Sequence, residues 1–184
     1  NVAPYLAKVV PMNGVTTLLD VGGGTGLYSY SLLQANPNLR AVIVELPEVA
    51  RIAEEFALEK GLQDRVEIIE GDMFRIDDLP PAQMVLFSNI LHDWDEPECR
   101  ELTARYAAKL PSGGRMLIHD VFLNDTMDGP LPIALYSSAL FSVTEGRAYS
   151  AAEYRAMLNA AGLITDGQIV NTLVHCAVLT GTKP

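Results

Sequence analysis

The chain has 184 residues, of which 49% are apolar and 20% are charged, as is typical of a single globular domain with a buried core. Its formal net charge of −10 at pH 7 repels phosphate backbones, so we expect no nucleic-acid partner. The sequence has no signal-peptide pattern and no apolar run of about 20 residues, so we expect a cytoplasmic protein without a membrane segment.

Apolar runs typical of strands alternate along the chain with stretches of helical period. Strands are predicted at residues 16–21, 39–46, 65–70, 84–89 and 115–123, and helices at residues 27–34, 47–60, 95–110, 133–143 and 150–162. In the second helix, Val49, Ile52 and Phe56 form an apolar stripe that we expect to face the core. Ser150 and Glu153 predict a capping box at the start of the last helix.

The end of the sequence differs from the rest. Residues 164–170 and 174–180 form two further strands with no helix between them, which indicates an antiparallel pair. The sequence therefore predicts one α/β domain over residues 1–184, with a mostly parallel, Rossmann-like sheet of seven strands, a C-terminal antiparallel hairpin and helices on both faces. Cys99 and Cys176 lie far apart and outside any Cys/His cluster, so we expect free thiols and no zinc site.

The segment LLDVGGGTG joins the first strand to the first helix. Gly22, Gly24 and Gly26 allow the backbone to pass close to a bound nucleoside, because no Cβ atom stands in the way. A dinucleotide fingerprint would need a glycine where Leu27 stands, and no Gly-Lys-Ser/Thr of a phosphate loop follows. The loop, together with Asp20, therefore favours a nucleoside ligand of another kind.

Two other strand ends should meet the same crevice, because the carboxyl ends of parallel strands lie at one edge of a sheet. Glu45 stands at the end of the second strand, where its carboxylate can accept hydrogen bonds from two ribose hydroxyls. After the third strand, Asp72 can accept from an adenine amino group, and Met73 offers an apolar, polarizable face. These residues complete a predicted nucleoside site.

The motifs LLDVGGGTG, VELPEVA, GDMF and ILHDWDEPE, in this order, resemble the small-molecule O-methyltransferases of plant phenolic and bacterial polyketide metabolism. The resemblance covers nearly the whole chain from Thr16 and implies the class I methyltransferase fold with S-adenosylmethionine as cofactor. The residues expected around this cofactor are Asp20, Gly22, Gly24, Gly26, Glu45, Leu46, Asp72, Met73, Phe74 and Ser88. Ser88 stands where plant members carry a lysine.

Methyl transfer from a sulfonium to a hydroxyl needs alignment of the acceptor and removal of its proton. His92, just past the fourth strand, matches the general base of the family, and Asp120 matches the acidic residue that orients it. Plant members carry a second glutamate where this sequence has Ala148, which leaves His92 with less support. Asp93 and Asp95 are interpreted as helix N-terminal carboxylates, and we predict no metal.

The acceptor is expected to contact Trp94, Met127, Tyr136 and Phe141. For Phe141, core packing is equally compatible with the helical spacing. His119 should point to the sheet face opposite to Asp120, and His175 is interpreted as a packed core residue. The identity of the acceptor remains open, and phenols, hydroxyquinones, polyketides and carotenoid alcohols all fit.

The resemblance also implies an N-terminal helical dimerisation domain, to which nothing in this sequence corresponds, so we expect a truncated chain and a homodimer for the full-length protein. Two alternatives to O-methylation remain open. One is a relative that keeps the cofactor but does not methylate, such as a polyketide hydroxylase, and the loss of the glutamate at Ala148 supports it. The other is a non-catalytic binding module.

Overall fold

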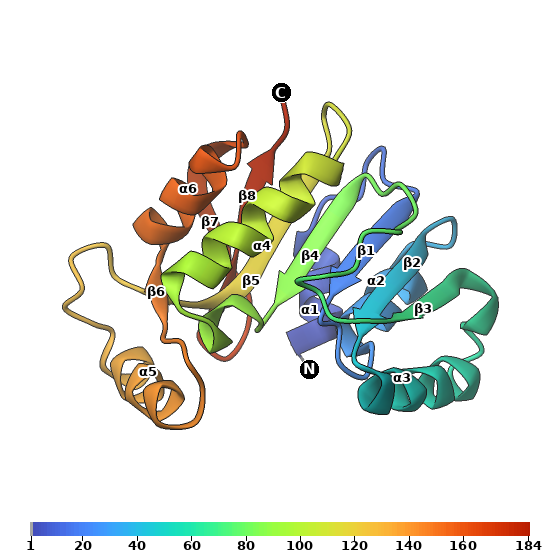
Figure 1. Cartoon of the computed structure of the whole chain (residues 1–184), viewed down its shortest axis with the longest axis horizontal. Coiled ribbons are helices and arrows are strands. Elements are labelled where there is room, and N and C mark those ends of the chain that lie inside the picture. The colour runs from blue at the N-terminus through green and yellow to red at the C-terminus, as the bar shows by residue number, and fades with distance from the viewer. Residues whose placement is uncertain (1) are drawn as a thin grey trace.

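The computed structural model describes residues 2–184 (Figure 1). The helices are α1 (Val2–Val9), α2 (Leu27–Ala35), α3 (Pro47–Glu59), α4 (Glu96–Lys109), α5 (Leu131–Val143) and α6 (Ala151–Ala160), with 3₁₀ helices η1 (Gln63–Arg65) and η2 (Leu91–Asp93). The strands are β1 (Thr17–Val21), β2 (Arg40–Glu45), β3 (Val66–Glu70), β4 (Met84–Ser88), β5 (Arg115–Leu123), β6 (Tyr149–Ser150), β7 (Ile164–Asn171) and β8 (Cys176–Thr182).

Seven strands form one continuous sheet in the order β3-β2-β1-β4-β5-β8-β7. The strands β1 to β5 are parallel, whereas β8 runs antiparallel to both β5 and β7. The predicted fold class and its C-terminal hairpin are therefore confirmed. The short β6, which pairs with the end of β5, was not predicted. The parallel strands all end at one edge of the sheet, where the glycine loop and η2 lie.

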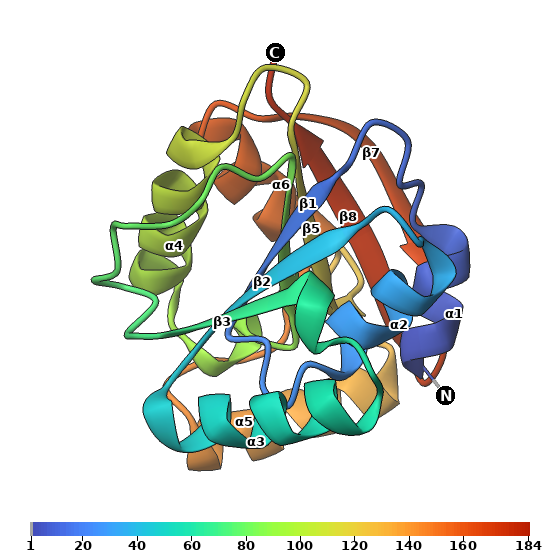
Figure 2. The same ribbon diagram turned by 90° about the vertical axis from the view of Figure 1, so that its right-hand side faces the viewer.

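Helices cover both faces of the sheet (Figures 1 and 2). The alternation of side chains along a strand divides the core between the two faces. In β1, Leu19 packs into a cluster with Leu102 and Tyr106 of α4, whereas Leu18 packs with Leu32 of α2 on the opposite face. α3 and α5 lie at the end of the molecule where the parallel strands terminate (Figures 1 and 2).

Most predicted elements agree with the observed ones within one or two residues. The capping box of α6 forms, because the Ser150 side chain accepts from the Glu153 N–H and the Glu153 carboxylate accepts from the Ser150 N–H. α1 was not predicted. Within residues 2–184, no helix combines the length and the apolar character needed to span a membrane.

The predicted apolar stripe of α3 was wrong. The side chains that α3 buries are the alanines at positions 50, 53 and 57, while Ile52 and Phe56 are 39% and 37% exposed. Small side chains let a helix approach its neighbours closely, so α3 packs on the sheet through its alanines and turns its larger apolar residues outward. Two apolar faces with the same helical period compete in this segment, and periodicity alone does not choose between them.

Candidate active site

A cavity of about 370 Å³ opens at the carboxyl ends of β1, β2, β3 and β4. Seven residues predicted for the cofactor or the acceptor line it, namely Gly22, Glu45, Leu46, Asp72, Met73, Phe74 and Trp94. Val44, Gly71, Ile90 and Asp93 also line it and were not predicted. The structure thus brings together four motifs that lie far apart in the sequence.

At two positions the glycine loop packs too closely against its neighbours to carry a side chain. A Cβ atom on Gly22 would lie 2.7 Å from Cδ1 of Ile90, and a Cβ atom on Gly26 would lie 2.3 Å from the ring of Tyr30. Both glycines have positive φ angles, of 65° and 80°, which side chains rarely adopt. Gly24 and Gly26 do not line the cavity and instead shape the turn.

Glu45 is held in place by backbone donors. Its two carboxylate oxygens accept from the N–H of Gly24, at 2.9 Å, and from the N–H of Leu46, at 2.8 Å. Each oxygen retains a lone pair for a further donor. The carboxylate is therefore fixed at the wall of the cavity, where it can accept hydrogen bonds from hydroxyl groups of a ligand.

The opposite wall is built by the segment after β3. The Asp72 carboxylate accepts from the Phe74 N–H at 2.9 Å, which fixes this turn. The rings of Phe74 and Trp94 meet edge to face, with their centroids 4.8 Å apart. The Tyr106 hydroxyl donates to the Met73 carbonyl at 3.0 Å. Together these contacts make an apolar wall on which a flat ring can lie.

The charge of this cavity is negative. Glu45, Asp72 and Asp93 contribute carboxylates to its lining, which includes no lysine or arginine among the residues that the structure describes. A phosphate group would meet only repulsion there, whereas a cationic ligand would be attracted. The site therefore suits a positively charged nucleoside better than a dinucleotide.

Besides Gly24 and Gly26, two further residues predicted around the cofactor, Asp20 and Ser88, lie outside this lining. Asp20 is buried beneath the glycine loop, where its carboxylate accepts from the Ser29 hydroxyl at 2.6 Å. Burial raises the pKa of Asp20 to about 6, against the lowering effect of the Ser29 hydrogen bond and with a smaller contribution from the charge of Glu45. Ser88 turns its hydroxyl to His119 instead, at 2.8 Å. Both side chains therefore make hydrogen bonds within the protein and do not face the cavity.

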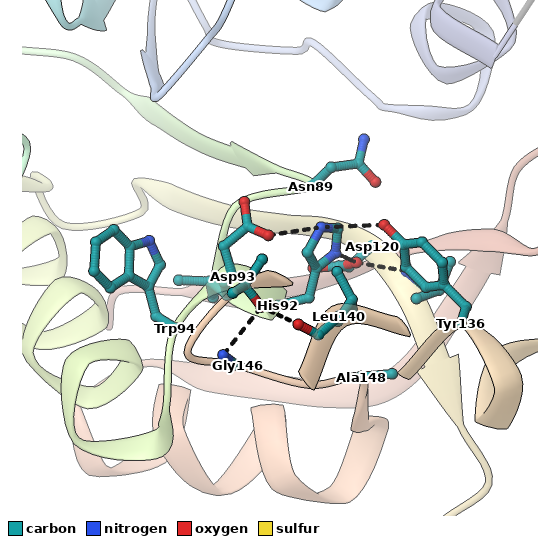
Figure 3. A network of polar contacts seen from close by, with 12 residues as sticks. Asn89, His92, Asp93, Trp94, Asp120, Tyr136, Leu140, Gly146 and Ala148 are labelled. Carbon is teal, nitrogen blue, oxygen red and sulfur yellow. Dashed lines mark hydrogen bonds and ion pairs between the residues drawn. The ribbon is translucent and has the colours of Figure 1, made fainter. Parts of the chain in front are cut away.

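His92 lies in η2, directly after β4, with 4% of its surface exposed. Its Nδ1 atom is 2.5 Å from Oδ1 of Asp120 at the middle of β5 (Figure 3). Asp120 is itself fixed, because it also accepts from the Val121 N–H at 2.8 Å and from the Tyr154 hydroxyl at 3.2 Å. The structure therefore forms the predicted pair of His92 and Asp120.

The other ring nitrogen of His92 faces two polar groups that approach from opposite sides (Figure 3). The Tyr136 hydroxyl lies 3.4 Å from Nε2, and Oδ1 of Asp93 lies 3.6 Å from it. Burial lowers the pKa of His92, but the hydrogen bond and charge of Asp120 and the charge of Asp93 outweigh burial and raise it overall. The imidazole is thus prepared to carry a proton.

Asp93 was interpreted as a helix N-terminal carboxylate, and that interpretation was wrong. It belongs to η2, lines the strand-end cavity and faces His92. Asp95 is the residue that caps α4, through a hydrogen bond from the Glu96 N–H to its side chain at 2.8 Å. α4 begins at Glu96 with Asp95 as its cap, so Asp93 lies outside the first turn of this helix.

The loop at Ala148 brings no carboxylate to His92 at the position where plant members carry the second glutamate. Ala148 is fully buried against Val121 and Ile133, and its N–H donates to the Ser137 hydroxyl at 3.1 Å. The neighbouring Gly146 passes so close to η2 that a Cβ atom there would lie 2.3 Å from the carbonyl oxygen of His92. This loop therefore supports η2 through backbone contacts.

Two predictions of core packing are wrong, those for Phe141 and His175. Met127 and Phe141 are 51% and 80% exposed and line neither the strand-end cavity nor the cavity beside Tyr136, so Phe141 is not a core residue. The contact of both residues with the acceptor stays a prediction. His175 is exposed in the turn between β7 and β8, whereas a packed core residue was expected. His119, in contrast, points away from Asp120 as predicted and is buried between Ser88 and Thr172.

Over residues 2–184, no three His, Cys, Asp or Glu side chains gather in a way that could hold a metal ion.

The O-methyltransferase domain family matches residues 2–164. The chain belongs to this family. A 3-hydroxy-5-methyl-1-naphthoate 3-O-methyltransferase from Streptomyces sahachiroi is 39% identical over 161 residues, which cover 87% of this chain and 46% of that protein.

Solved structures agree with this assignment. An O-methyltransferase family 2 protein from Planctomyces limnophilus, in complex with apigenin, superposes with a TM-score of 0.94 at 47% identity, over 100% of this chain and 58% of that one. Human N-acetylserotonin methyltransferase in complex with SAM gives a TM-score of 0.88 at 25% identity, over 98% of this chain and 51% of that one. This O-methyltransferase domain therefore spans about half the length of its relatives.

Proposed function

We propose that this domain binds S-adenosylmethionine and transfers its methyl group to a hydroxyl oxygen of a small aromatic or polyketide acceptor, with His92 as general base. The observation that carries this proposal is the buried pair of His92 and Asp120, which leaves the Nε2 atom facing Tyr136 and Asp93, the latter a residue of the cavity lining. The intact pair is the reason for preferring methylation over a cofactor-binding relative that does not methylate, or a non-catalytic module.

The residues of the cavity fit this cofactor. Its sulfonium is cationic, which suits a lining with three carboxylates and no described basic residue. Glu45 would accept from the ribose hydroxyls, Asp72 from the adenine amino group, and the apolar wall of Met73 and Phe74 would hold the adenine ring. When bound, the cofactor supplies an activated methyl group.

The chain's own residues then handle the proton. The acceptor hydroxyl would donate to Nε2 of His92, and this nitrogen would take the proton as the new C–O bond forms. Asp120 accepts the hydrogen bond from Nδ1–H of His92, so Nε2 is the nitrogen that can accept a proton. The negative charge of Asp120 then stabilises the imidazolium that results. Asp93 adds a second negative charge on the Nε2 side.

We further propose that the domain works within a longer, homodimeric protein of the cytoplasm that serves secondary metabolism. The span of about half of each relative's length supports a longer protein. Light scattering on the longer protein would give its oligomeric state.

The experiment that tests the proposed function is a calorimetric titration with S-adenosylmethionine, S-adenosylhomocysteine and NADH. We expect micromolar binding of both sulfur nucleosides and no binding of NADH. Glu45→Ala should weaken the binding of both sulfur nucleosides roughly tenfold or more, because it removes a charged hydrogen-bond acceptor. Glu101→Ala, which removes an exposed carboxylate from α4, is the matched control and should change nothing. Absence of nucleoside binding to the unmodified protein would refute the proposal.

A further inference from the structure

Asp93 lies between the strand-end cavity and the candidate base. Its side chain is 42% exposed and lines the cavity, and its Oδ1 atom is 3.6 Å from Nε2 of His92 (Figure 3). Its backbone is anchored on both sides, since its N–H donates to the Ile90 carbonyl at 3.1 Å and its carbonyl accepts from the Glu145 N–H at 3.2 Å. The carboxylate therefore has a fixed place at the border between the cavity and the imidazole.

The other two carboxylates of the cavity already have partners in the protein. Glu45 accepts from two backbone N–H groups. Asp72 accepts from one backbone N–H and lies 3.4 Å from the guanidinium of Arg75. Within residues 2–184, the Asp93 carboxylate accepts no hydrogen bond from a backbone N–H or a hydroxyl group and has no lysine or arginine within ion-pair distance. Its negative charge is therefore available to His92 and to a ligand of the cavity.

Asp93 and His92 influence each other's charge. Burial raises the pKa of the Asp93 carboxyl, the charge of His92 lowers it, and the charge of Asp120 raises it further. For His92, burial lowers the pKa, while the hydrogen bond and charge of Asp120, together with the charge of Asp93, raise it overall. The two neighbouring groups thus stabilise each other's charged form.

The proposed reaction moves a positive charge past this carboxylate. The reacting oxygen must lie about 3 Å from Nε2 of His92 to give up its proton, and about 3–3.5 Å from the methyl carbon that it attacks. As the C–O bond forms, the electron pair of the S–C bond stays on sulfur, which becomes neutral, and the hydroxyl proton moves to Nε2, which becomes positive. Because Asp93 borders both the cavity and Nε2, a positive charge lies near it before and after the transfer.

We infer that Asp93 is a specificity-determining residue that distinguishes the cationic, methylated cofactor from its product, in which the sulfur is neutral. This inference rests on the proposed function, since it takes the cavity as the site of S-adenosylmethionine. The product S-adenosylhomocysteine lacks only the methyl group and the charge on sulfur, so a nearby carboxylate favours the cofactor over the product. Glu45 and Asp72 are assigned to the ribose and the adenine, which both ligands share, and do not discriminate.

The position of Asp93 beside His92 also keeps this preference from slowing the reaction. A negative charge that stabilised only the sulfonium would favour the ground state over the transition state and raise the barrier. Asp93 also faces the Nε2 atom of His92, where the positive charge develops as the proton arrives. The same carboxylate therefore stabilises the charge at both ends of its movement.

The test is a calorimetric titration with S-adenosylmethionine, S-adenosylhomocysteine and sinefungin, at a pH above the pKa of His92, where this ring is neutral. Sinefungin carries an amine-bearing carbon in place of the methylated sulfur, so it keeps a positive charge without a sulfonium. Asp93→Asn removes the charge, and Asp93→Glu keeps it. Asp72→Asn removes another carboxylate of the same cavity, and Asp78→Asn removes an exposed carboxylate outside the lining as the matched control.

Asp93→Asn should weaken S-adenosylmethionine and sinefungin about five- to tenfold and leave S-adenosylhomocysteine within about twofold, as for the loss of one partly exposed charge contact. Asp72→Asn should weaken all three ligands alike, Asp93→Glu should keep the preference of the unmodified protein, and Asp78→Asn should change nothing. The retained binding of S-adenosylhomocysteine shows that Asp93→Asn remains folded.

An NMR titration of the His92 ring gives a second measurement, independent of any ligand. Its pKa should fall in Asp93→Asn, because a negative charge beside Nε2 is removed. Equal weakening of S-adenosylmethionine and S-adenosylhomocysteine by Asp93→Asn, the same loss of preference in Asp93→Glu, or an unchanged pKa of His92 would each overturn the inference. Binding of S-adenosylmethionine to the unmodified protein would leave the proposed function standing in each case, whereas its absence would remove both.

Discussion

Two buried histidines, His92 and His119, share one end of the sheet and behave in opposite ways. His92 is 4% exposed and pairs with a carboxylate, and its pKa is raised. His119 is fully buried between two hydroxyl groups, and its pKa is lowered to about 4. Burial is thus similar for the two rings. Their different pKa values arise from their hydrogen-bond partners, a carboxylate for His92 and two hydroxyl groups for His119.

The difference arises from the alternation of side chains along β5. Asp120 points to the face where η2 lies and meets His92, while the adjacent His119 points to the opposite face and meets Ser88 of β4. One strand therefore supplies the acid that supports a candidate base and, one residue away, a neutral ring that supports the scaffold. The predictions below separate these two roles.

The largest effect should follow from replacing His92. His92→Gln removes the base while keeping a polar side chain, so methyl transfer should fall by about 10²–10⁴-fold, the usual contribution of general base catalysis. The affinity for S-adenosylmethionine should stay unchanged, because His92 does not line the cofactor cavity. Release of S-adenosylhomocysteine measures the rate, and His119→Gln is the comparison. A larger loss of rate for His119→Gln than for His92→Gln would reverse the two roles.

A change behind η2 should come next. In Gly146→Ala, the added methyl group would lie 2.3 Å from the His92 carbonyl oxygen and 2.5 Å from the Trp94 nitrogen. These are backbone atoms that cannot move aside, so we expect a loss of about 3 kcal/mol or more in the free energy of unfolding. In Gly71→Ala, the methyl group meets only the flexible end of Ile76, at 2.8 Å, so the loss should be much smaller. Urea denaturation measures both, and similar losses would contradict the close packing at Gly146.

The pH dependence of stability should reveal the neutral state of His119. Its pKa is lower in the folded protein than the ordinary value of 6.5, so its contribution to stability is present above pH 6.5 and is lost as the pH falls through about 4. The stability of the unmodified protein, relative to His119→Gln, should therefore decrease by up to about 3 kcal/mol between pH 7 and pH 4. Urea denaturation at several pH values would show it, and a constant difference would mean that His119 is charged or solvated.

Asp20 should show the opposite sign, with an effect of about 2–3 kcal/mol at most. Burial raises its pKa to about 6 in the folded protein, so its contribution to stability is present below pH 3.8 and is lost as the pH rises through 6. Asp20→Asn keeps an acceptor for the Ser29 hydroxyl, and it should gain stability relative to the unmodified protein between pH 4 and pH 7. The same denaturation series measures this, and an unmodified protein that gains stability relative to Asp20→Asn over that range would contradict it.

Much of this architecture follows from local patterns in the sequence. β5 was predicted with both of its ends correct, since a continuous apolar run is bounded by a glycine pair and a polar loop. Among the site residues, His92 was found from its place after a strand in the ILHDWDEPE motif, and Asp120 from its match to the acidic residue that orients the base in the family that the sequence resembles. The pairing of these two side chains is the observed consequence of parallel strands that end at one edge.

Other features depended on contacts that a sequence does not display. Asp93 was assigned to the next helix because an acidic residue before a helical stretch is typical of an N-terminus, and only the 3₁₀ turn of η2 redirects it to His92. His175 was placed in a strand because the segment NTLVHC contains no glycine or proline to mark a turn. Its left-handed turn is held by the contact of Thr172 with His119, which is distant in sequence.

The measurement that tests the central claim most directly is an NMR titration of the three histidine rings in the unmodified protein and in Asp120→Asn, with His119→Gln and His175→Gly used for assignment. We predict that His92 titrates above 6.5 and that its pKa falls in Asp120→Asn, while His119 does not take up a proton until the pH nears 4. The rate of methyl transfer should then rise with pH through the pKa of His92. A His92 that titrates below 6.5, or that is indifferent to Asp120→Asn, would contradict its assignment as a base supported by that carboxylate.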